Sequence, residues 1–138
     1  VIVTDRKVAG ILLEAGTAEV VCGIGVNVNQ LEGELPTQTK IPAGSLALAT
    51  GAPHDRARLL GELLTTLELR YDDWRAAGLA PLLPELAGRN WLRGKAVATG
   101  DGNGIAGEIG ADGRLLIELP DGTTRAIGSA EVIPLPSG

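Results

Sequence analysis

Two apolar segments near the N-terminus carry glycines where a strand normally places side chains. They span residues 8–13 and 18–28, and residues 15–17 form a hairpin connection between them. Glycine weakens a strand, and inside one it often marks the close approach of a ligand or another backbone. Lys7 heads the first segment, and its compact positive charge suits an anionic ligand group. The pattern predicts a β-hairpin that forms the floor of a ligand site, with bulges or close sheet packing as the alternative.

The residues around these glycines form two motifs, K-x-A-G-I-L-x-E and G-I-G-x-N-x-N. The first is met by Lys7, Ala9, Gly10, Ile11, Leu12 and Glu14, and the second by Gly23, Ile24, Gly25, Asn27 and Asn29. In this order and spacing they resemble the biotin protein ligases, also called biotin–[acetyl-CoA-carboxylase] ligases. The resemblance continues through Gly44-Ser45-Leu46, a helical segment and a C-terminal β module, so it covers essentially the whole chain.

The resemblance implies an ATP-dependent ligase that activates biotin as biotinyl-5'-adenylate and transfers it to a lysine of a biotin carboxyl carrier protein. For the complete enzyme it implies ATP, biotin and Mg²⁺, a cytoplasmic location and homodimer formation. The family also carries a Gly/Arg-rich loop and a K-W-P-N-D motif upstream of this run. We therefore expect the chain to be the C-terminal part of a ligase and to be inactive when isolated.

The resemblance also assigns roles to particular residues. Lys7 is expected to be catalytic, the alternative being an ordinary solvated lysine at a strand end. The biotin-binding residues implied are Gly10, Ile11, Leu12, Gly23 and Gly25, and the nucleotide-binding residues are Asn27 and Asn29. No metal ligand is expected in this portion.

Asn27 and Asn29 also stand out without the resemblance. They alternate with Val26 and Val28, so both are expected on one face of the strand. Asparagine is depleted in strands, so two on one face call for an explanation. The resemblance places Asn27 at the nucleotide end of the site, whereas Asn29 has a strand-end cap as its alternative role.

The predicted fold is α+β, with part of a mixed β-sheet and helices packed on one face, followed by a small SH3-like β-barrel. The domains are expected at residues 1–90 and 91–138. The near-continuous apolar character of residues 18–28 predicts burial on both faces. Residues 29–44 lack periodicity and predict a long loop, interpreted as a lid over the ligand or as a solvated connection.

Helices are expected at residues 45–50, at 55 to about 75, and at 79–86 with an interruption at Pro84. Ser45 and Asp55 are the predicted N-caps. Six residues form one helical stripe, which predicts a face against the core, with a partner-binding face as the alternative; they are Leu60, Leu63, Leu64, Leu67, Tyr71 and Trp74.

After Trp91 short strands with Asp-Gly turns predict the barrel. The strands are expected at residues 95–99, 105–109, 115–119, 123–127 and 132–133, with a turn over 101–104. Glu131, after Gly128-Ser129, resembles a family ending.

Charge and composition exclude several classes. The net charge of −5 and the absence of a basic block argue against nucleic-acid binding. The single cysteine, Cys22, cannot form an intramolecular disulfide and is expected to be buried in an apolar strand. No apolar run approaches the roughly 20 residues of a membrane span, and Arg6 is expected to be a solvated turn residue. A second hypothesis of another class is a non-catalytic half-ligase that acts as a dimerisation or carrier-binding module.

Overall fold

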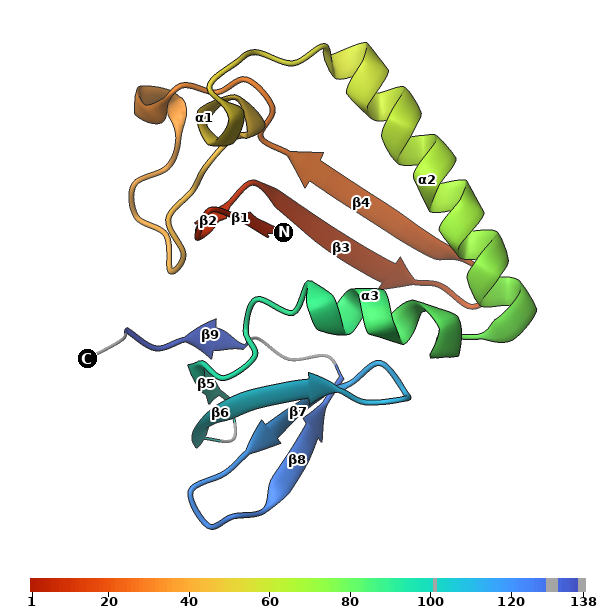
Figure 1. The fold of residues 1–138 in the computed structure, drawn as a ribbon, viewed down its shortest axis with the longest axis vertical. Coiled ribbons are helices and arrows are strands. Elements are labelled where there is room, and N and C mark those ends of the chain that lie inside the picture. The colour runs from red at the N-terminus through yellow and green to blue at the C-terminus, as the bar shows by residue number, and fades with distance from the viewer. Residues whose placement is uncertain (101, 129–131, 137–138) are drawn as a thin grey trace. The chain divides into compact units, whose positions relative to one another are not determined.

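The computed structural model describes residues 1–100, 102–128 and 132–136. The chain is divided into two compact units, which comprise residues 1–63 and 64–138. Both contain helices and antiparallel strands (Figure 1). The predicted α+β class is therefore confirmed at this level.

The first unit is built on two antiparallel strand pairs. A tight turn with positive φ at Thr4 and Asp5 joins β1 (Ile2–Val3) to β2 (Arg6–Lys7). β3 (Ala9–Ala15) then pairs with β4 (Val20–Val26) along its whole length, from Ala9 opposite Val26 to Ala15 opposite Val20. The predicted hairpin is confirmed.

The prediction that residues 18–28 are buried on both faces is wrong for most of the strand. Val20 and Val21 are 62% and 57% exposed, and Cys22 is exposed rather than buried. The reason is that β4 pairs only with β3 among the described residues, and an apolar strand is buried only where another layer covers it. Burial begins at the end of this segment, where Val28 is 8% exposed.

The buried part of the first unit lies at the ends of the hairpin strands. Its buried residues are Val8, Ala9, Val28, Leu35, Ala43, Gly44 and Ser45. Leu35 and Ala43 belong to the long connection after β4, which contains the short 3₁₀ helix η1 (Glu32–Glu34). The end of this connection is hydrogen-bonded to β2, since the Lys7 amide donates to the Pro42 carbonyl and the Lys7 carbonyl accepts from the Gly44 amide.

Both predicted helix caps are confirmed. The Ser45 hydroxyl accepts a hydrogen bond from the Leu48 amide at 3.1 Å at the start of α1 (Leu46–Thr50). The Asp55 carboxylate accepts bonds from the Ala57 and Arg58 amides, at 2.8 and 3.1 Å, at the start of α2 (Arg56–Ala77). Within the described residues, no helix has the length and apolar character that a bilayer span requires.

The apolar stripe on α2 does not face a core in this chain, so that prediction is wrong here. Periodicity fixes which side chains share a helix face but not what lies against that face. Five of the six side chains are about half exposed, namely Leu60, Leu64, Leu67, Tyr71 and Trp74.

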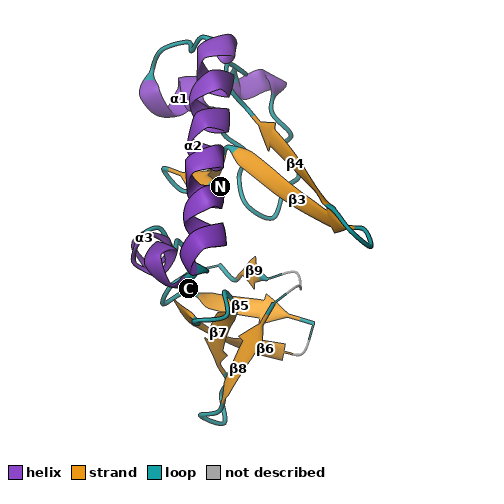
Figure 2. Cartoon of the chain, turned by 90° about the vertical axis from the view of Figure 1, so that its right-hand side faces the viewer, coloured by secondary structure: helices purple, strands orange, loops and turns teal. Residues whose placement is uncertain are grey.

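The second unit holds the short helices η2 (Ala80–Leu82) and α3 (Leu83–Gly88) and one antiparallel sheet (Figure 2). Pro84 lies in the first turn of α3, where a missing amide hydrogen is tolerated, so it helps to begin the helix rather than interrupting it. The sheet order is β8-β7-β6-β5-β9. Its strands are β5 (Ala96–Thr99), β6 (Gly102–Ile109), β7 (Leu115–Glu118), β8 (Thr124–Ile127) and β9 (Ile133–Pro134).

The core of this sheet is formed by Val97, Ala106 and Ile117, each at most 1% exposed. All five predicted strands are present, although β6 begins at Gly102 and so includes most of the predicted 101–104 turn. Asp101, Ser129 and Glu131 lie outside the described residues. Barrel closure and the SH3-like assignment stay predictions, as does the division at residues 90 and 91.

Candidate functional site

The register of the β3–β4 hairpin gathers most of the predicted biotin residues on one face. Gly10 lies opposite Gly25, and Leu12 lies opposite Gly23. Residues opposite each other in an antiparallel pair share a face, and neighbours along a strand alternate. Ile11, opposite Ile24, therefore belongs to the other face. We call the face of Gly10, Leu12, Gly23 and Gly25 the glycine face.

The glycine face is open. A methyl group placed on Gly25 would meet no described atom within 4 Å. One placed on Gly23 would lie 3.8 Å from the Leu12 carbonyl oxygen, and one on Gly10 would lie 3.9 Å from Cε of Lys7, both ordinary contacts. Packing among the described residues therefore does not require these glycines. This observation favours close approach of a ligand over close sheet packing.

Lys7 lies at the end of this face and is fixed by its backbone. Its amide donates to the Pro42 carbonyl at 2.8 Å, and its carbonyl accepts from the Gly44 amide at 2.9 Å. The side chain is exposed, and its Cε is the described atom nearest to a methyl group placed on Gly10. Among the residues that the structure describes, the Lys7 ammonium forms no ion pair. An exposed cation thus lies beside a floor of bare backbone.

Asn27 reaches the same point from the end of β4. Its amide donates to the Val8 carbonyl at 2.8 Å, and its side-chain Nδ2 donates to the Gly44 carbonyl at 2.9 Å. Gly44 therefore hydrogen-bonds to Lys7 through its N–H and to Asn27 through its C=O. One residue of the long connection joins the two polar residues predicted for catalysis and nucleotide binding.

Asn29 is fully engaged with the backbone of His54. Its Oδ1 accepts from the His54 amide at 2.8 Å, and its Nδ2 donates to the His54 carbonyl at 2.9 Å. These bonds tie the end of β4 to the segment before α2. The side chain has a structural role here, and nucleotide binding by Asn29 stays a prediction.

Arg6 is not the solvated turn residue that we expected. Its Nε donates to the Ala43 carbonyl at 2.7 Å, and its Nη2 pairs with the Glu32 carboxylate. The hydrogen bond from Arg6 lowers the pKa of Glu32, and the same bond raises the pKa of Arg6. The sequence offered no signal for this contact, because Arg6 and Ala43 are 37 positions apart.

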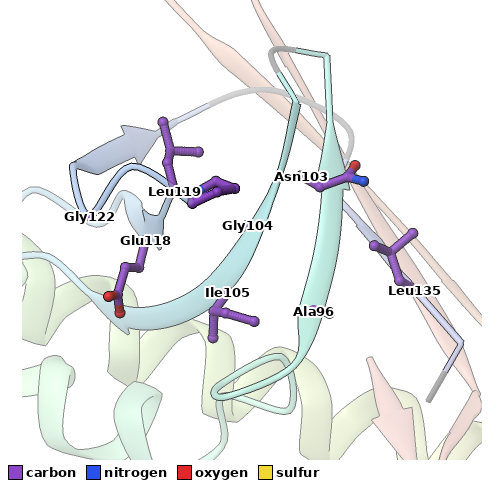
Figure 3. Close-up of a pocket in the computed structure, with 9 residues that line it drawn as sticks. Ala96, Asn103, Gly104, Ile105, Glu118, Leu119, Gly122 and Leu135 are labelled. Atoms are coloured by element: carbon purple, nitrogen blue, oxygen red, sulfur yellow. The ribbon is translucent and has the colours of Figure 1, made fainter. Parts of the chain in front are cut away.

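Among the hollows lined by described residues are two that lie outside the glycine face. One of about 230 Å³ lies between Arg6 and the long connection. The other, of about 470 Å³, lies in the second unit and contains none of the predicted site residues; Figure 3 shows Asn103, Leu119 and Leu135 around it. Among the described residues, no three His, Cys, Asp or Glu side chains gather as a metal site.

Comparison with known proteins gave relatives of a single kind. The bifunctional ligase/repressor BirA of Bacillus subtilis (strain 168) is 36% identical over 87 residues, which cover 59% of this chain and 27% of that protein. The biotin–[acetyl-CoA-carboxylase] ligase of Mycobacterium tuberculosis is 34% identical over an alignment that covers 98% of this chain and 50% of that ligase. No family model matches the chain.

Solved structures agree with these relatives. The biotin protein ligase from Aquifex aeolicus superposes with a TM-score of 0.82 and 25% identity, over 95% of this chain and 60% of that chain. The same ligase in complex with biotin and ATP gives 0.81 and 26%, over 96% and 57%. This chain thus spans between about a quarter and a half of the curated relatives described above.

Proposed function

We propose, from the homology of this chain to the C-terminal part of the biotin protein ligases, that it forms part of an ATP-dependent ligase. That ligase would activate biotin as biotinyl-5'-adenylate and transfer it to a lysine of a biotin carboxyl carrier protein.

One observation carries the proposal. Both motifs meet at the open glycine face, with the exposed ammonium of Lys7 beside it. Backbone without side chains lets a ring system, such as the fused rings of biotin, lie close against the peptides of the two strands. Activation places negative charge on carboxylate and phosphate oxygens, and a fixed cation stabilises such charge. The chain's own residues therefore suit a biotin-like ring and an anionic group together.

Lys7 is proposed to contact the reacting carboxylate or phosphate oxygens. Asn27 is proposed to orient the nucleotide. The hydrogen bond from its Nδ2 to the Gly44 carbonyl fixes the side chain close to Lys7. Mg²⁺ would arrive with ATP and supply charge neutralisation at the phosphates. The antiparallel sheet of the second unit is proposed to be the family's SH3-like module, and the cytoplasm is the proposed location.

A second candidate is a non-catalytic half-ligase that binds a carrier domain or a second copy. The exposed apolar residues of the hairpin favour it, since Leu12 and Leu13 are 65% and 62% exposed. Chains that bind through such a surface need no working Lys7. The two candidates therefore differ in how they respond to a change at that residue.

The test is a chimeric ligase in which residues 1–138 replace the matching half of the Mycobacterium tuberculosis relative. We expect biotin-dependent exchange of pyrophosphate into ATP. Lys7→Ala should lower this rate by on the order of 10²–10³, the usual effect of removing a preorganised charge contact. The thermal stability of this variant should stay close to that of the parent chimera.

The matched control is Lys40→Ala. Lys40 lies in the long connection and is not among the predicted site residues. This variant should leave the exchange rate within about threefold of the parent. An active chimera whose rate does not respond to Lys7→Ala would return Lys7 to the solvated role. A folded but inactive chimera would favour the non-catalytic candidate.

A further inference from the structure

The long connection after β4 is held at two points by one side chain. The Arg6 guanidinium pairs with Glu32 near the beginning of the connection and donates to the Ala43 carbonyl near its end. The fixed fork of an arginine can bind two acceptors at once, which an ammonium on a flexible stem does less well. Arg6 therefore closes residues 32–43 into a loop fastened to β2.

The close approach of the loop end to Cβ of Arg6 also requires a glycine at position 44. A methyl group there would lie 2.7 Å from Cβ of Arg6, a distance that real side chains essentially never show. Because Cβ is attached to the backbone, Arg6 could not move aside without moving β2. Gly44 is also buried and hydrogen-bonded to Lys7 and Asn27.

β2 therefore has two sides with different tasks. The backbone of Lys7 forms a parallel bridge with Ala43, so the loop end acts as a short additional strand beside β2. Arg6 secures that strand from one position, while the Lys7 side chain extends over Gly10. Loosening Arg6 would free the bridge that fixes the backbone of Lys7.

We propose that Arg6 is a positioning residue, whose guanidinium fastens the 32–43 loop to β2 and thereby holds Lys7 and Asn27 in register beside the glycine face. This inference rests on the proposed function for its catalytic consequence, but not for the conformational one. Arg6 acts through the loop, since its Nε and Nη2 face Ala43 and Glu32. The contact has little weight for global stability, because a partly exposed ion pair contributes little.

The conformational consequence can be tested on the chain as it stands, by amide hydrogen exchange. Arg6→Ala should lower the protection of the Leu35, Lys7 and Gly44 amides by about tenfold, because their acceptors lie in or beside the loop. Glu32→Gln releases only one of the two points, so it should give a smaller loss at the same amides. Because Glu32→Gln leaves Arg6 in place, the hydrogen-exchange test can still be made with this variant if Arg6→Ala fails to fold.

Arg58→Ala is the matched control, because Arg58 forms an exposed ion pair with Glu62 on α2. It should leave the exchange of the three amides unchanged. Unchanged protection in both Arg6→Ala and Glu32→Gln would overturn the proposal.

The catalytic consequence is tested in the chimeric ligase. Arg6→Ala should lower kcat/KM by about 10- to 100-fold, the range expected when a reacting group is misplaced by about 1 Å. Arg6→Lys retains one contact and should recover part of this loss, whereas Arg58→Ala should have no effect. A loss explained entirely by a smaller folded fraction would overturn the positioning role. If the parent chimera is inactive, the proposed function fails. The amide hydrogen-exchange experiment on residues 1–138 still decides whether Arg6 holds the loop.

Discussion

Two glycines that lie inside strands, Gly104 and Gly25, differ in the physical reason for their presence. Gly104 is required by packing, because a methyl group there would lie 2.5 Å from the Glu118 carbonyl oxygen and 2.6 Å from Ile117. Gly25 has open space where its side chain would be. Sequence alone cannot separate these two cases, because both are glycines inside strands.

This difference gives a prediction for Gly25→Ala. Stability to urea should stay within about 1 kcal/mol of the parent, or rise slightly, because alanine loses less backbone entropy in a strand. In the chimeric ligase, KM for biotin should rise by about tenfold or more. The added methyl group would occupy space that the ligand needs, and one carbon in a fitted pocket changes binding by about that factor.

Gly104→Ala is the contrasting variant. It should lower the free energy of unfolding by roughly 1–3 kcal/mol, as overpacking does. If Gly25→Ala instead destabilised the chain as much as Gly104→Ala, the glycine face would be a packing surface and not a ligand floor.

A pH dependence follows from the Arg6–Glu32 pair. Arg6 lowers the pKa of Glu32 below its ordinary value of 4.5, so the pair stabilises the loop above that pH. This stabilisation is lost as the pH falls through the lowered pKa. The chemical shift of the Gly44 amide, followed by NMR, should therefore be constant near neutrality and change below about pH 4.5. Glu32→Gln should remove the change, and a titration that persists in this variant would assign it to another carboxyl group.

At the scale of elements, local chemistry determines where helices and hairpins begin and end. Asp55 and Ser45 were predicted as caps and act as caps, because their side chains satisfy amides of the next turn. The hairpin and all strands of the second unit were likewise predictable from alternation and Asp-Gly turns. The two motifs predicted a resemblance to the biotin protein ligases, and the curated relatives and solved structures described above carry ligase names of that kind.

The surroundings of these elements were not predictable. β4 and the stripe on α2 are as apolar as core elements, but their exposure depends on which other residues cover them. The bonds of Arg6 to Ala43 and of Asn29 to His54 join positions 37 and 25 residues apart, and no local pattern encodes them. The glycine face, the position of Lys7 and its link to Asn27 needed the register that only the structure gives.

The cap of α2 supplies a prediction at this scale. Asp55→Ala should lower the free energy of unfolding by about 1 kcal/mol, because two amides lose their acceptor. Glu68→Ala, an exposed substitution inside the same helix, should change it by less than about 0.5 kcal/mol. Urea titrations of both variants make the comparison, and equal effects would show that the cap contributes nothing specific.

At the scale of the whole chain, the exposed hairpin predicts self-association. Within the described part of the chain, β3 and β4 form a two-stranded sheet whose outer edges pair with no further strand, and their exposed apolar side chains make it a template for another strand. Sedimentation at tens of micromolar should therefore show a dimer or larger species. Val21→Lys places a charge on β4 and should shift the chain toward monomer. A parent chain that sediments as a monomer at this concentration would contradict the prediction.

The hydrogen bonds of Gly44 also matter for protein design. Lys7 and Asn27, proposed for catalysis and nucleotide binding, are joined through a peptide that neither strand contains, and that peptide fits beside Arg6 only because residue 44 is a glycine. A graft of the two sequence motifs onto another scaffold would transfer their residues without the peptide that holds Lys7 and Asn27 together. The smallest transplantable unit is discontinuous: it comprises β2, the hairpin with Asn27 after it, Glu32 and the Ala43-Gly44 segment.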